Sequence, residues 1–452
     1  MPTPARAPLL ALVLALAGTG RASRAPRGWN NFDAGPVDEA GLLVAAAWLR
    51  VNLLAFGFDT LCVDGGWNIN GSSFTIDAFG RPYPRLDLFP SAADGRGFAS
   101  FAAKIHGMGL KLGVWIHRGM DDTTYAANPP IWNSSFHAQD AGVTTNDCVW
   151  APSFLGTNAP SPAATAWYRG LAQLYVDQQI DFAKMDCMYA GHEGSNNAEL
   201  EAFSEAFSAV APNVTISLSP GGGSSTENAS WVAAGGGRRG TMYRVVTDFH
   251  DTEGEWALRN HLEVAGQFSG FSGLNATFFD LDLIPFSPAG RPCRYGAATQ
   301  QLLFSLYCIT RAPLILGTDI PVSDAAALAL VTNRGALAVN EFSANNRNVS
   351  VLATNTSAAD GLWAWAAEPT DGSPGVYVAL FNIAGADALI SVAVPPGAGA
   401  PPLCAADVYT GERVAGAQFA EGEFSAPIAN QASGLFRIAP CASFAFAARG
   451  RP

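Results

Sequence analysis

The strongest constraint on the fold is an alternation of short apolar runs with longer amphipathic segments over the first three quarters of the chain. The apolar runs end near Asn30, Asp64, Trp115, Asp186, Leu218, Asp248, Asp282 and Leu316. Between them, segments such as 97–108 and 165–179 have the apolar spacing of a helix that packs on a core. Eight strand ends over about 290 residues give a repeat of roughly 36 residues, enough for one strand, one helix and their loops. The sequence therefore predicts an α/β fold, a parallel (β/α)₈ TIM barrel, over residues 25–340.

The remaining residues have a different pattern. After about Asn340 the helical spacing stops, and runs such as 376–381 and 388–394 lie between turns rich in glycine and proline. This pattern predicts a small antiparallel β-sandwich domain over residues 341–452. The chain has 452 residues, of which 49% are hydrophobic, so it can bury a barrel-sized core and a smaller second one.

The N-terminus and the glycosylation motifs predict a route through the secretory pathway. Residues 1–24 combine a basic residue, an apolar run at 9–17 and small residues after it, which is typical of a signal peptide. The run is shorter than the roughly 20 residues that cross a bilayer, and we expect no membrane span. Seven Asn-X-Ser/Thr motifs occur, at Asn70, Asn133, Asn213, Asn228, Asn275, Asn348 and Asn355. We therefore expect a secreted, vacuolar or extracellular glycoprotein.

Charge and cysteine content narrow the class of ligand. Asp and Glu number 38 against 26 Lys and Arg, a net charge of -12, which disfavours a nucleic-acid partner. The seven cysteines are compatible with disulfides, and the odd count leaves at least one outside an internal pair. The cysteines form no CxxC pair and the six histidines show no HExxH spacing, so we predict neither a metal nor another cofactor.

Two carboxylates are placed to meet at the mouth of the predicted barrel. In such barrels the C-terminal ends of the strands converge on one face. Asp186 and Asp248 are 62 residues apart (248 − 186), about two strand-helix units, which places them on next-but-one strands. Two carboxylates facing each other across a mouth are what glycoside hydrolysis requires.

The residues beside these two aspartates strengthen the prediction without deciding it. The period of two in a strand puts Lys184 on the same face as Asp186, where its ammonium favours an ionised carboxylate and can bind a sugar hydroxyl. The same period puts Arg244 and Asp248 on one face of another predicted strand. From these residues alone, a plain ion pair or an Asp186 that caps a helix explains the pattern equally well.

Six short motifs in a fixed order then carry a resemblance to a known family. They are Gly28-Trp29-Asn30, Lys111-Leu112-Gly113-Val114, Lys184-Met185-Asp186-Cys187, Arg244 with Asp248, Asp280-Leu281-Asp282, and Arg311-Ala312-Pro313-Leu314-Ile315 followed by Gly317 and Asp319. Together they resemble glycoside hydrolase family 27, the α-galactosidase or melibiase group, across roughly residues 28–340. Each motif is short, and their shared order makes the resemblance specific.

The resemblance implies a retaining exo-glycosidase that removes terminal α-D-galactosyl residues from an oligosaccharide or glycoconjugate by double displacement. It implies Asp186 as the nucleophile and Asp248 as the acid/base. It also implies a set of substrate-binding residues: Phe32, Asp64, Lys184, Ser219, Arg244 and Asp282. Cys148 resembles the cysteine that the family pairs with the one after the nucleophile, here Cys187.

Some positions depart from the family pattern and bear on the sugar. The segment 217–221 looks similar to a plant branch that includes β-L-arabinopyranosidases with α-galactosidase activity. Where the family has two adjacent aspartates after strand 2, this chain has Asp64-Gly65, which removes one ligand for a hydroxyl. Phe32 replaces a Trp or Tyr, and Phe249-His250 replace polar or Trp residues. We therefore predict that β-L-arabinopyranosides, which lack the C6 hydroxymethyl group, are cleaved at rates comparable to α-D-galactosides.

Two other functions fit the same fold. One is an α-N-acetylgalactosaminidase-like specificity at the same site. The other is a barrel that binds carbohydrate without cleaving it, which would be expected to lack a catalytic carboxylate. Both Asp186 and Asp248 are present, which favours the enzyme.

Overall fold

The computed structural model describes residues 24–33, 35–190, 194–221, 226–288, 291–320, 324–354 and 361–446. The predicted signal peptide, apart from its last residue, lies outside these residues, as do Asn355 and the side chain of Asn228. In the part of the chain that the structure describes, no helix is long and apolar enough to span a bilayer.

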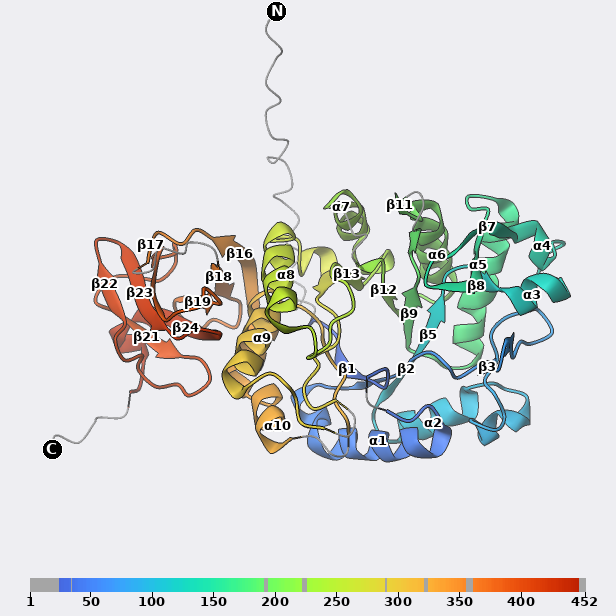
Figure 1. Ribbon diagram of the computed structural model, residues 1–452, viewed down its shortest axis with the longest axis horizontal. Helices are drawn as coiled ribbons and strands as arrows, with labels where there is room; N and C mark the ends of the chain where they lie inside the picture. The colour runs from blue at the N-terminus through green and yellow to red at the C-terminus, as the bar shows by residue number, and fades with distance from the viewer. Residues whose placement is uncertain are drawn as a thin grey trace, which may run out of the picture.

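Eight parallel strands form a curled sheet that carries the site. They are β1 (Arg27–Asn30), β2 (Thr60–Val63), β5 (Lys111–His117), β9 (Phe182–Asp186), β12 (Thr215–Leu218), β13 (Met242–Arg244), β14 (Phe278–Asp280) and β15 (Leu314–Leu316). Their order is β14-β13-β12-β9-β5-β2-β1-β15, and each neighbouring pair is parallel. A parallel bridge between Ile284 and Leu316 joins the segment after β14 to β15, which closes the ring. The predicted (β/α)₈ barrel is confirmed (Figure 1).

Helices follow the strands around the outside of the barrel (Figure 1). They are α1 (Glu39–Asn52), α2 (Ala99–Gly107), α5 (Pro162–Asp177), α6 (Asn197–Val210), α7 (Thr226–Gly235), α8 (Gly254–Gln267), α9 (Ala297–Ile309), α10 (Ala325–Val331) and α11 (Arg334–Glu341). The amphipathic segments 97–108 and 165–179 correspond to α2 and α5. The start of α5 is set locally, because the Ser161 hydroxyl accepts from the backbone N–H of Ala164 and Pro162 occupies the first turn.

Short elements lie in the connections between the strands and helices of the barrel, and one of them, η6, lies in the sandwich. The hairpin strands and short strands are β3 (Ile69–Asn70), β4 (Ser73–Phe74), β6 (Met120–Asp121), β7 (Gly142–Cys148), β8 (Ala151–Thr157), β10 (Tyr189–Ala190) and β11 (Gly194–Ser195). The short helices are α3 (Asp122–Ala127), α4 (Ala138–Ala141), η1 (Leu54–Phe56), η2 (Pro90–Asp94), η4 (Gly236–Arg238), η5 (Leu274–Ala276) and η6 (Cys441–Ser443). Two of these hairpins, β3–β4 and β7–β8, flank the site described below.

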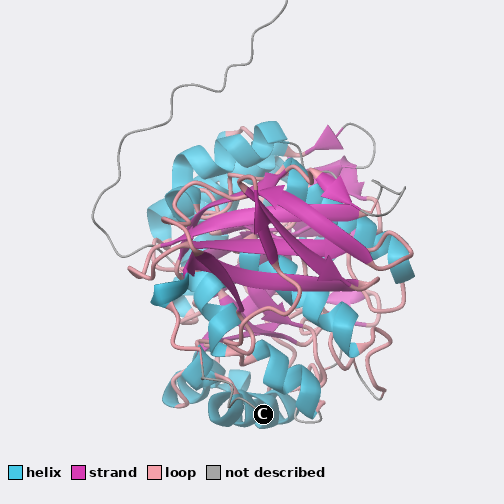
Figure 2. Cartoon of the chain, turned by 90° about the vertical axis from the view of Figure 1, so that its left-hand side faces the viewer, coloured by secondary structure: helices cyan, strands magenta, loops and turns pink. Residues whose placement is uncertain are grey.

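The C-terminal part is an antiparallel sandwich, as predicted. Its strands are β16 (Ser343–Val349), β17 (Ala353–Thr354), β18 (Leu362–Pro369), β19 (Val376–Asn382), β20 (Ala388–Ala393), β21 (Leu403–Asp407), β22 (Gln418–Ala420), β23 (Glu423–Ile428) and β24 (Ala432–Pro440). One sheet has the order β16-β18-β19-β24-β21 and the other β17-β20-β23-β22. Figure 2 shows these strands in front of the barrel.

Strand β19 explains how the sandwich attaches to the barrel. All seven of its residues are buried. By the period of two, Val378 and Leu380 face the core between the two sheets, whereas Tyr377 and Phe381 belong to the barrel's own hydrophobic core. Helix α9, which is buried along most of its length, lies between the barrel and this sheet (Figure 1).

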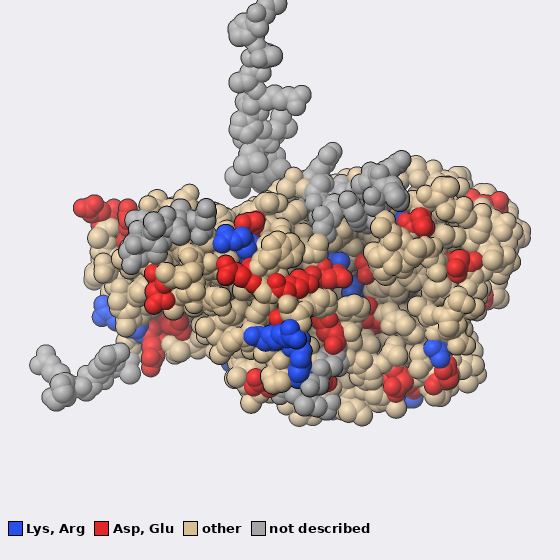
Figure 3. Space-filling view, in the orientation of Figure 1, with Lys and Arg blue, Asp and Glu red and all other residues tan. Residues whose placement is uncertain are grey.

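The cysteines form two disulfides, Cys148–Cys187 at the mouth of the barrel and Cys404–Cys441 in the sandwich. Three thiols, those of Cys62, Cys293 and Cys308, are unpaired. The pairing of Cys148 with Cys187 that the resemblance implies is therefore present in the structure. On the molecular face shown in Figure 3, acidic side chains are spread widely and no continuous basic surface is visible.

Candidate active site

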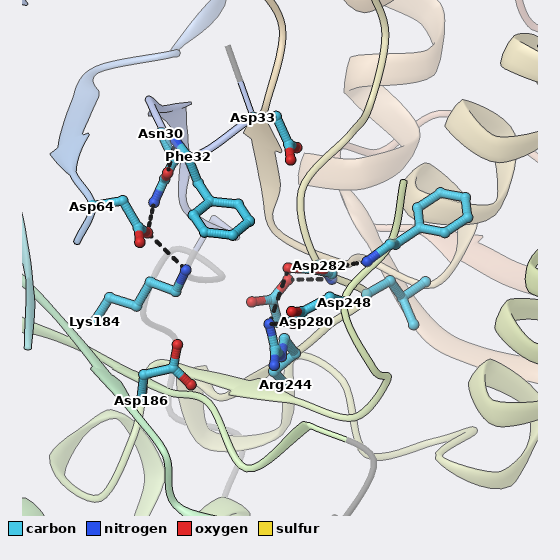
Figure 4. Close-up of polar contacts among 12 residues, drawn as sticks. Asn30, Phe32, Asp33, Asp64, Lys184, Asp186, Arg244, Asp248, Asp280 and Asp282 are labelled. Carbon is cyan, nitrogen blue, oxygen red and sulfur yellow. Dashed lines mark hydrogen bonds and ion pairs between the residues drawn. The ribbon is translucent and has the colours of Figure 1, made fainter. Parts of the chain in front are cut away.

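One pocket at the carboxyl end of the barrel collects most of the expected site residues. Its lining includes seven of them: Phe32, Asp64, Lys184, Asp186, Arg244, Asp248 and Asp282. These side chains come from β9 and β13 and from the segments that follow β1, β2, β13 and β14, and they point toward a common centre (Figure 4). Asp186 and Asp248, which the sequence placed on opposite sides of a mouth, line the same pocket.

Ser219 is the exception among the expected residues. It follows β12 directly and is buried, but it does not line this pocket. Its backbone N–H donates to the carbonyl of Met185, which continues the pairing of β12 with β9. Its position therefore supports the strand that carries Asp186, and the structure does not bring its side chain to the pocket.

Asp186 ends β9, and both of its carboxylate oxygens are held. The indole N–H of Trp115 donates to Oδ2 at 3.1 Å, and the backbone N–H of Cys187 donates to Oδ1 at 2.8 Å. Cys187 has a φ of 57°, a left-handed conformation that turns the chain sharply after the strand. Its disulfide to Cys148 ties this turn to the β7–β8 hairpin. The carboxylate is therefore fixed in orientation before any ligand binds.

Lys184 and Asp64 form a buried ion pair beside Asp186. The Lys184 ammonium lies 2.8 Å from Asp64 Oδ2, which also accepts from the Asn30 amide at 2.7 Å (Figure 4). Burial on its own raises the pKa of the Asp64 carboxyl, but Lys184 and these hydrogen bonds outweigh burial and lower it. Burial likewise lowers the pKa of Lys184, whereas Asp64 and Asp186 raise it above its ordinary value. Both groups are charged, and the direct partner of Lys184 is Asp64 rather than Asp186.

Arg244 joins two carboxylates on the other side of the pocket. Its Nη1 lies 2.8 Å from Asp248 Oδ1 and 3.3 Å from Asp282 Oδ1. Burial lowers the pKa of the guanidinium, but Asp282, Asp186 and Asp248 raise it more. The Asp248 side chain is 59% exposed, while that of Asp282 is buried. Asp248 therefore lies at the open end of the pocket.

The predicted strand position of Asp248 is wrong. Strand β13 ends at Arg244, and Val245 makes one more backbone bond, to the carbonyl of Asp280, before the chain leaves the sheet. The backbone N–H of Phe249 then donates to Asp282 Oδ2 at 2.8 Å instead of to a neighbouring strand. Asp248 therefore lies in a loop whose backbone is hydrogen-bonded to the Asp282 carboxylate. From this loop its side chain reaches Arg244.

The segment after β14 contains two buried aspartates. Asp282 has a φ of 72°, and its backbone N–H donates to Asp280 Oδ1 at 2.9 Å. Burial and the neighbouring charge of Asp282 raise the pKa of Asp280 to about 7. Asp280 lies beneath the pocket, in the barrel interior, together with Lys184 and Asp282. Its raised pKa limits the number of negative charges packed under the site near neutral pH.

An ion pair that the sequence did not predict lies at the rim of the pocket. Asp33 Oδ1 lies 3.1 Å from His250 Nδ1, and both residues line the pocket. The hydrogen bond to Asp33 raises the pKa of His250 to about 9, while burial raises that of Asp33. The imidazole also stacks on Phe32 with ring centroids 6.4 Å apart. The pair links the segment after β1 to the loop that carries Asp248, and its only sequence signal is the unusual Phe249-His250.

A second cavity, here called the outer groove, continues outward from the pocket. The two share Phe32, Asp64, Asp186, Arg244 and Asp248. Beyond these shared residues, aromatic and aliphatic side chains dominate the walls of the outer groove: Ile69, Phe74, Trp115, Trp150 and Phe154. In the described parts of the chain, no group of three or more His, Cys, Asp or Glu residues is arranged to hold a metal ion.

Comparisons with known proteins find relatives and solved structures that are similar to this chain. No family model matches the sequence. The α-galactosidase of Oryza sativa subsp. japonica is 23% identical over 340 residues, which cover 75% of this chain and 66% of that protein, just under two thirds of its length. A probable α-galactosidase of Dictyostelium discoideum is 25% identical over 338 residues, 74% of this chain and 71% of that protein.

Solved structures are similar over nearly the whole chain. A family 27 β-L-arabinopyranosidase from Geobacillus stearothermophilus has a TM-score of 0.83 at 25% identity, covering 95% of this chain and 98% of that one. A putative α-N-acetylgalactosaminidase from Bacillus halodurans has a TM-score of 0.77 at 24% identity, covering 92% and 97%. The chain is similar in sequence to α-galactosidases and shares the fold of solved glycosidases. These similarities support the assignment of the chain to glycoside hydrolase family 27, the family that its motifs resemble.

Proposed function

We propose that the protein is a retaining exo-glycosidase that hydrolyses terminal α-D-galactosyl and β-L-arabinopyranosyl residues. The observation that carries the proposal is that Asp186 and Asp248 line one pocket, with Asp186 held by Trp115 and Cys187 and Asp248 exposed at the opening. A carboxylate fixed inside and a carboxyl group at the entrance suit the two roles of a glycosidase pair.

In the proposed reaction, an Asp186 oxygen attacks the anomeric carbon while Asp248 gives a proton to the departing oxygen. The resulting glycosyl ester on Asp186 is then hydrolysed by water, from which Asp248 takes a proton. Arg244, 2.8 Å from Asp248, holds this side chain in place between the two steps. Asp248 lies where the pocket meets the outer groove, the direction in which a leaving group departs.

The other charged groups are placed to bind ring hydroxyls. Asp64 and Lys184 are buried, charged and hydrogen-bonded to each other, and Asp282 is held by Arg244. Hydrogen bonds to charged groups contribute about 1.5 to 3 kcal/mol each, so this set can select one arrangement of hydroxyls. The pocket also has an aromatic wall, Phe32, for the apolar face of a sugar.

The stereochemistry of the product tests the mechanism. Proton NMR of the first-formed sugar should show retention, and mass spectrometry should detect a glycosyl ester on Asp186 with a slow substrate. A retaining pair is separated by about 5 to 5.5 Å, whereas an inverting pair needs about 6.5 Å or more, and an inverted product would overturn the proposal. Asp248→Ala should retain more activity on aryl glycosides, which have good leaving groups, than on alkyl glycosides.

The choice of sugar rests on Gly65. This residue lines the outer groove beside Asp64 and contributes no side chain to bind a C6 hydroxyl. The structural similarity to a β-L-arabinopyranosidase is consistent with a pocket that accepts a sugar without C6. A panel of aryl α-D-galactoside, β-L-arabinopyranoside and N-acetyl-α-D-galactosaminide tests the proposal, with kcat/KM for the first two expected within about tenfold.

We also propose that the protein passes through the secretory pathway. Its two disulfides suit an oxidising compartment. Five of the seven glycosylation motifs have an exposed asparagine: Asn70, Asn133, Asn213, Asn275 and Asn348. Expression in a eukaryotic secretory host should give a protein whose mass falls on treatment with peptide N-glycosidase.

A further inference from the structure

The outer groove has no assigned ligand, and its position defines which part of a substrate it meets. It shares Asp186 and Asp248 with the pocket, so a group that leaves the anomeric carbon enters it. Its cavity volume is about 650 Å³, within the range of cavities that hold drug-sized organic molecules, whereas the pocket encloses only about 30 Å³. The end of the outer groove beside Asp64, Gly65 and Asp186 therefore holds part of the sugar. Under the proposed function, on which this inference rests, the other end of the outer groove, beside Trp150, receives the aglycone.

Two tight hairpins build the walls. The β3–β4 hairpin turns through Gly71, whose φ is 63°, and contributes Phe74. The β7–β8 hairpin turns through Val149 and Trp150, directly after Cys148. Because Cys148 is bonded to Cys187, a disulfide connects this turn to the residue that follows Asp186. The hairpin that carries Trp150 is therefore covalently linked to the segment that carries Asp186.

Aromatic rings form the surface of this wall. Trp150 is 60% exposed, although its ring contacts Phe154 edge-on with centroids 6.2 Å apart. Phe154 in turn packs against Phe74 at 5.2 Å and Trp115 at 5.9 Å, and these three rings are buried. Phe74 and Trp115 fix the position of Phe154, and the Trp150 ring, which contacts Phe154, has an exposed face. Because it lies in a groove beside the two carboxylates, this aromatic ring offers a flat apolar face on which a ligand can stack.

The polar groups of the outer groove decide which ligand fits. Among the described residues that line it and are not shared with the pocket, none is charged, and the side-chain hydroxyls are those of Ser72 and Ser153. A second sugar carries several hydroxyls, and each one buried without a hydrogen bond is unfavourable. The pocket, in contrast, surrounds its sugar with charged groups. The lining therefore favours an apolar leaving group over another sugar.

We propose that the end of the outer groove beside Trp150 is an aglycone subsite for a neutral group with a flat aromatic or apolar face, and that Trp150 is its stacking platform. The natural substrates would then be glycosides of phenolic or other apolar alcohols rather than oligosaccharides. Trp150 acts on the specificity for the leaving group and takes no part in proton transfer or in nucleophilic attack.

The test compares benzyl and methyl glycosides of the same sugar. Benzyl alcohol and methanol are nearly equal in acidity, so the ratio of kcat/KM isolates binding of the aglycone. We expect a ratio of at least about ten for the wild type, from the apolar area that the ring buries. Trp150→Ala should bring the ratio to near one and leave the methyl glycoside within about twofold, whereas Trp150→Phe should keep most of the preference.

Val149→Ala is the matched control. Val149 lies in the same turn and is 53% exposed, but it does not line the outer groove, so its loss should not change the ratio. A wild-type ratio near one, or a Trp150→Ala variant that keeps the ratio, would overturn the inference while the proposed function stands. A disaccharide substrate whose kcat/KM depends on Trp150 more than that of the benzyl glycoside would show a sugar subsite instead. If no glycoside is hydrolysed, the proposed function fails, and the inference fails with it.

Discussion

At the scale of single residues, Gly65 offers the sharpest test of sugar choice. A Cβ atom built on Gly65 would lie 3.6 Å from the Trp115 ring, an ordinary contact, and the residue has no left-handed backbone conformation. A side chain is therefore sterically acceptable there. The space beside Asp64 is open to an additional carboxylate.

We predict that Gly65→Asp raises the preference for α-D-galactosides over β-L-arabinopyranosides by about tenfold or more. The added carboxylate supplies a charged hydrogen bond, worth about 1.5 to 3 kcal/mol, to a hydroxyl that only galactose has. The measurement is kcat/KM for the two aryl glycosides. Gly65→Ala fills the space without a hydrogen bond and should leave the ratio unchanged. A wild type that already prefers galactoside by more than about a hundredfold would contradict the prediction.

The Asp33–His250 pair makes a prediction about pH. His250 has a pKa of about 9 because Asp33 accepts its hydrogen bond, with smaller contributions from Asp282 and Glu253. A raised histidine pKa stabilises the fold fully below its ordinary value of about 6.5, and this contribution is lost as the pH rises through about 9. Since the His250 side chain is 39% exposed, solvent weakens the effect on global stability.

We predict that Asp33→Asn lowers the pKa of His250 from about 9 toward about 6.5. In this variant the ion pair is absent and His250 loses its own charge at lower pH, so the alkaline limb of kcat/KM should move in the same direction. NMR titration of the His250 ring and a pH–rate profile measure the two effects. Glu253→Gln removes a charge that contributes less to the His250 pKa, so it should shift the His250 pKa and the alkaline limb far less. An unchanged alkaline limb with a lowered His250 pKa would show that the pair does not position the loop.

At the scale of elements, the two disulfides provide a matched comparison. Cys148–Cys187 spans 39 residues and Cys404–Cys441 spans 37, so each constrains the unfolded chain to a similar extent. They differ in position. The first joins the β7–β8 hairpin to the end of β9, while the second joins β21 to the residue after β24 in the sandwich.

We predict that replacing both cysteines of either disulfide by serine lowers the free energy of unfolding by about 2 to 4 kcal/mol. Only the Cys148/Cys187 variant should also lower kcat/KM, because it releases the turn that orients Asp186. Chemical unfolding followed by tryptophan fluorescence, together with initial rates well below the transition, separates the two effects. Equal rate losses in both double variants would indicate that the first disulfide has no specific effect on the site.

At the scale of the whole molecule, the barrel and the sandwich share one hydrophobic core. The barrel core includes Trp365 and Leu435 of the sandwich. Polar contacts cross the same boundary, since the Tyr409 hydroxyl lies 2.8 Å from that of Ser305 and the Asn333 amide donates to the Tyr409 carbonyl at 2.9 Å. Separation of the two parts would expose this surface, so we expect them to unfold together.

We predict that Leu380→Ala, a change in the core between the two sheets of the sandwich, lowers the temperature at which the distant active site is lost. Truncation of a buried leucine costs about 2 to 5 kcal/mol, and a shared core transmits that loss to the barrel. Calorimetry should show a single transition that coincides with loss of activity. Leu352 is exposed, so Leu352→Ala should change neither the temperature of the calorimetric transition nor the temperature at which activity is lost. A barrel that remains active after the sandwich has unfolded would contradict the prediction.

The sequence by itself determined the elements and several of the groups at the mouth. Apolar periodicity predicted the alternating strands and helices of the barrel and the change to antiparallel strands near residue 340, because burial repeats with the period of each element. The same local rule placed Lys184 and Asp186 in one strand, and both line the pocket. These features depend on neighbours a few residues apart, which a pattern in the sequence records.

Only the tertiary structure decided which of these groups meet. Lys184 pairs with Asp64, and His250 with Asp33, a residue 217 positions earlier (250 − 33). Asp248 lies in a loop instead of the predicted strand because the backbone N–H of Phe249 donates to the Asp282 carboxylate, which follows a different strand. Contacts of this kind depend on the closure of the barrel, which brings distant segments together, and no local periodicity encodes them.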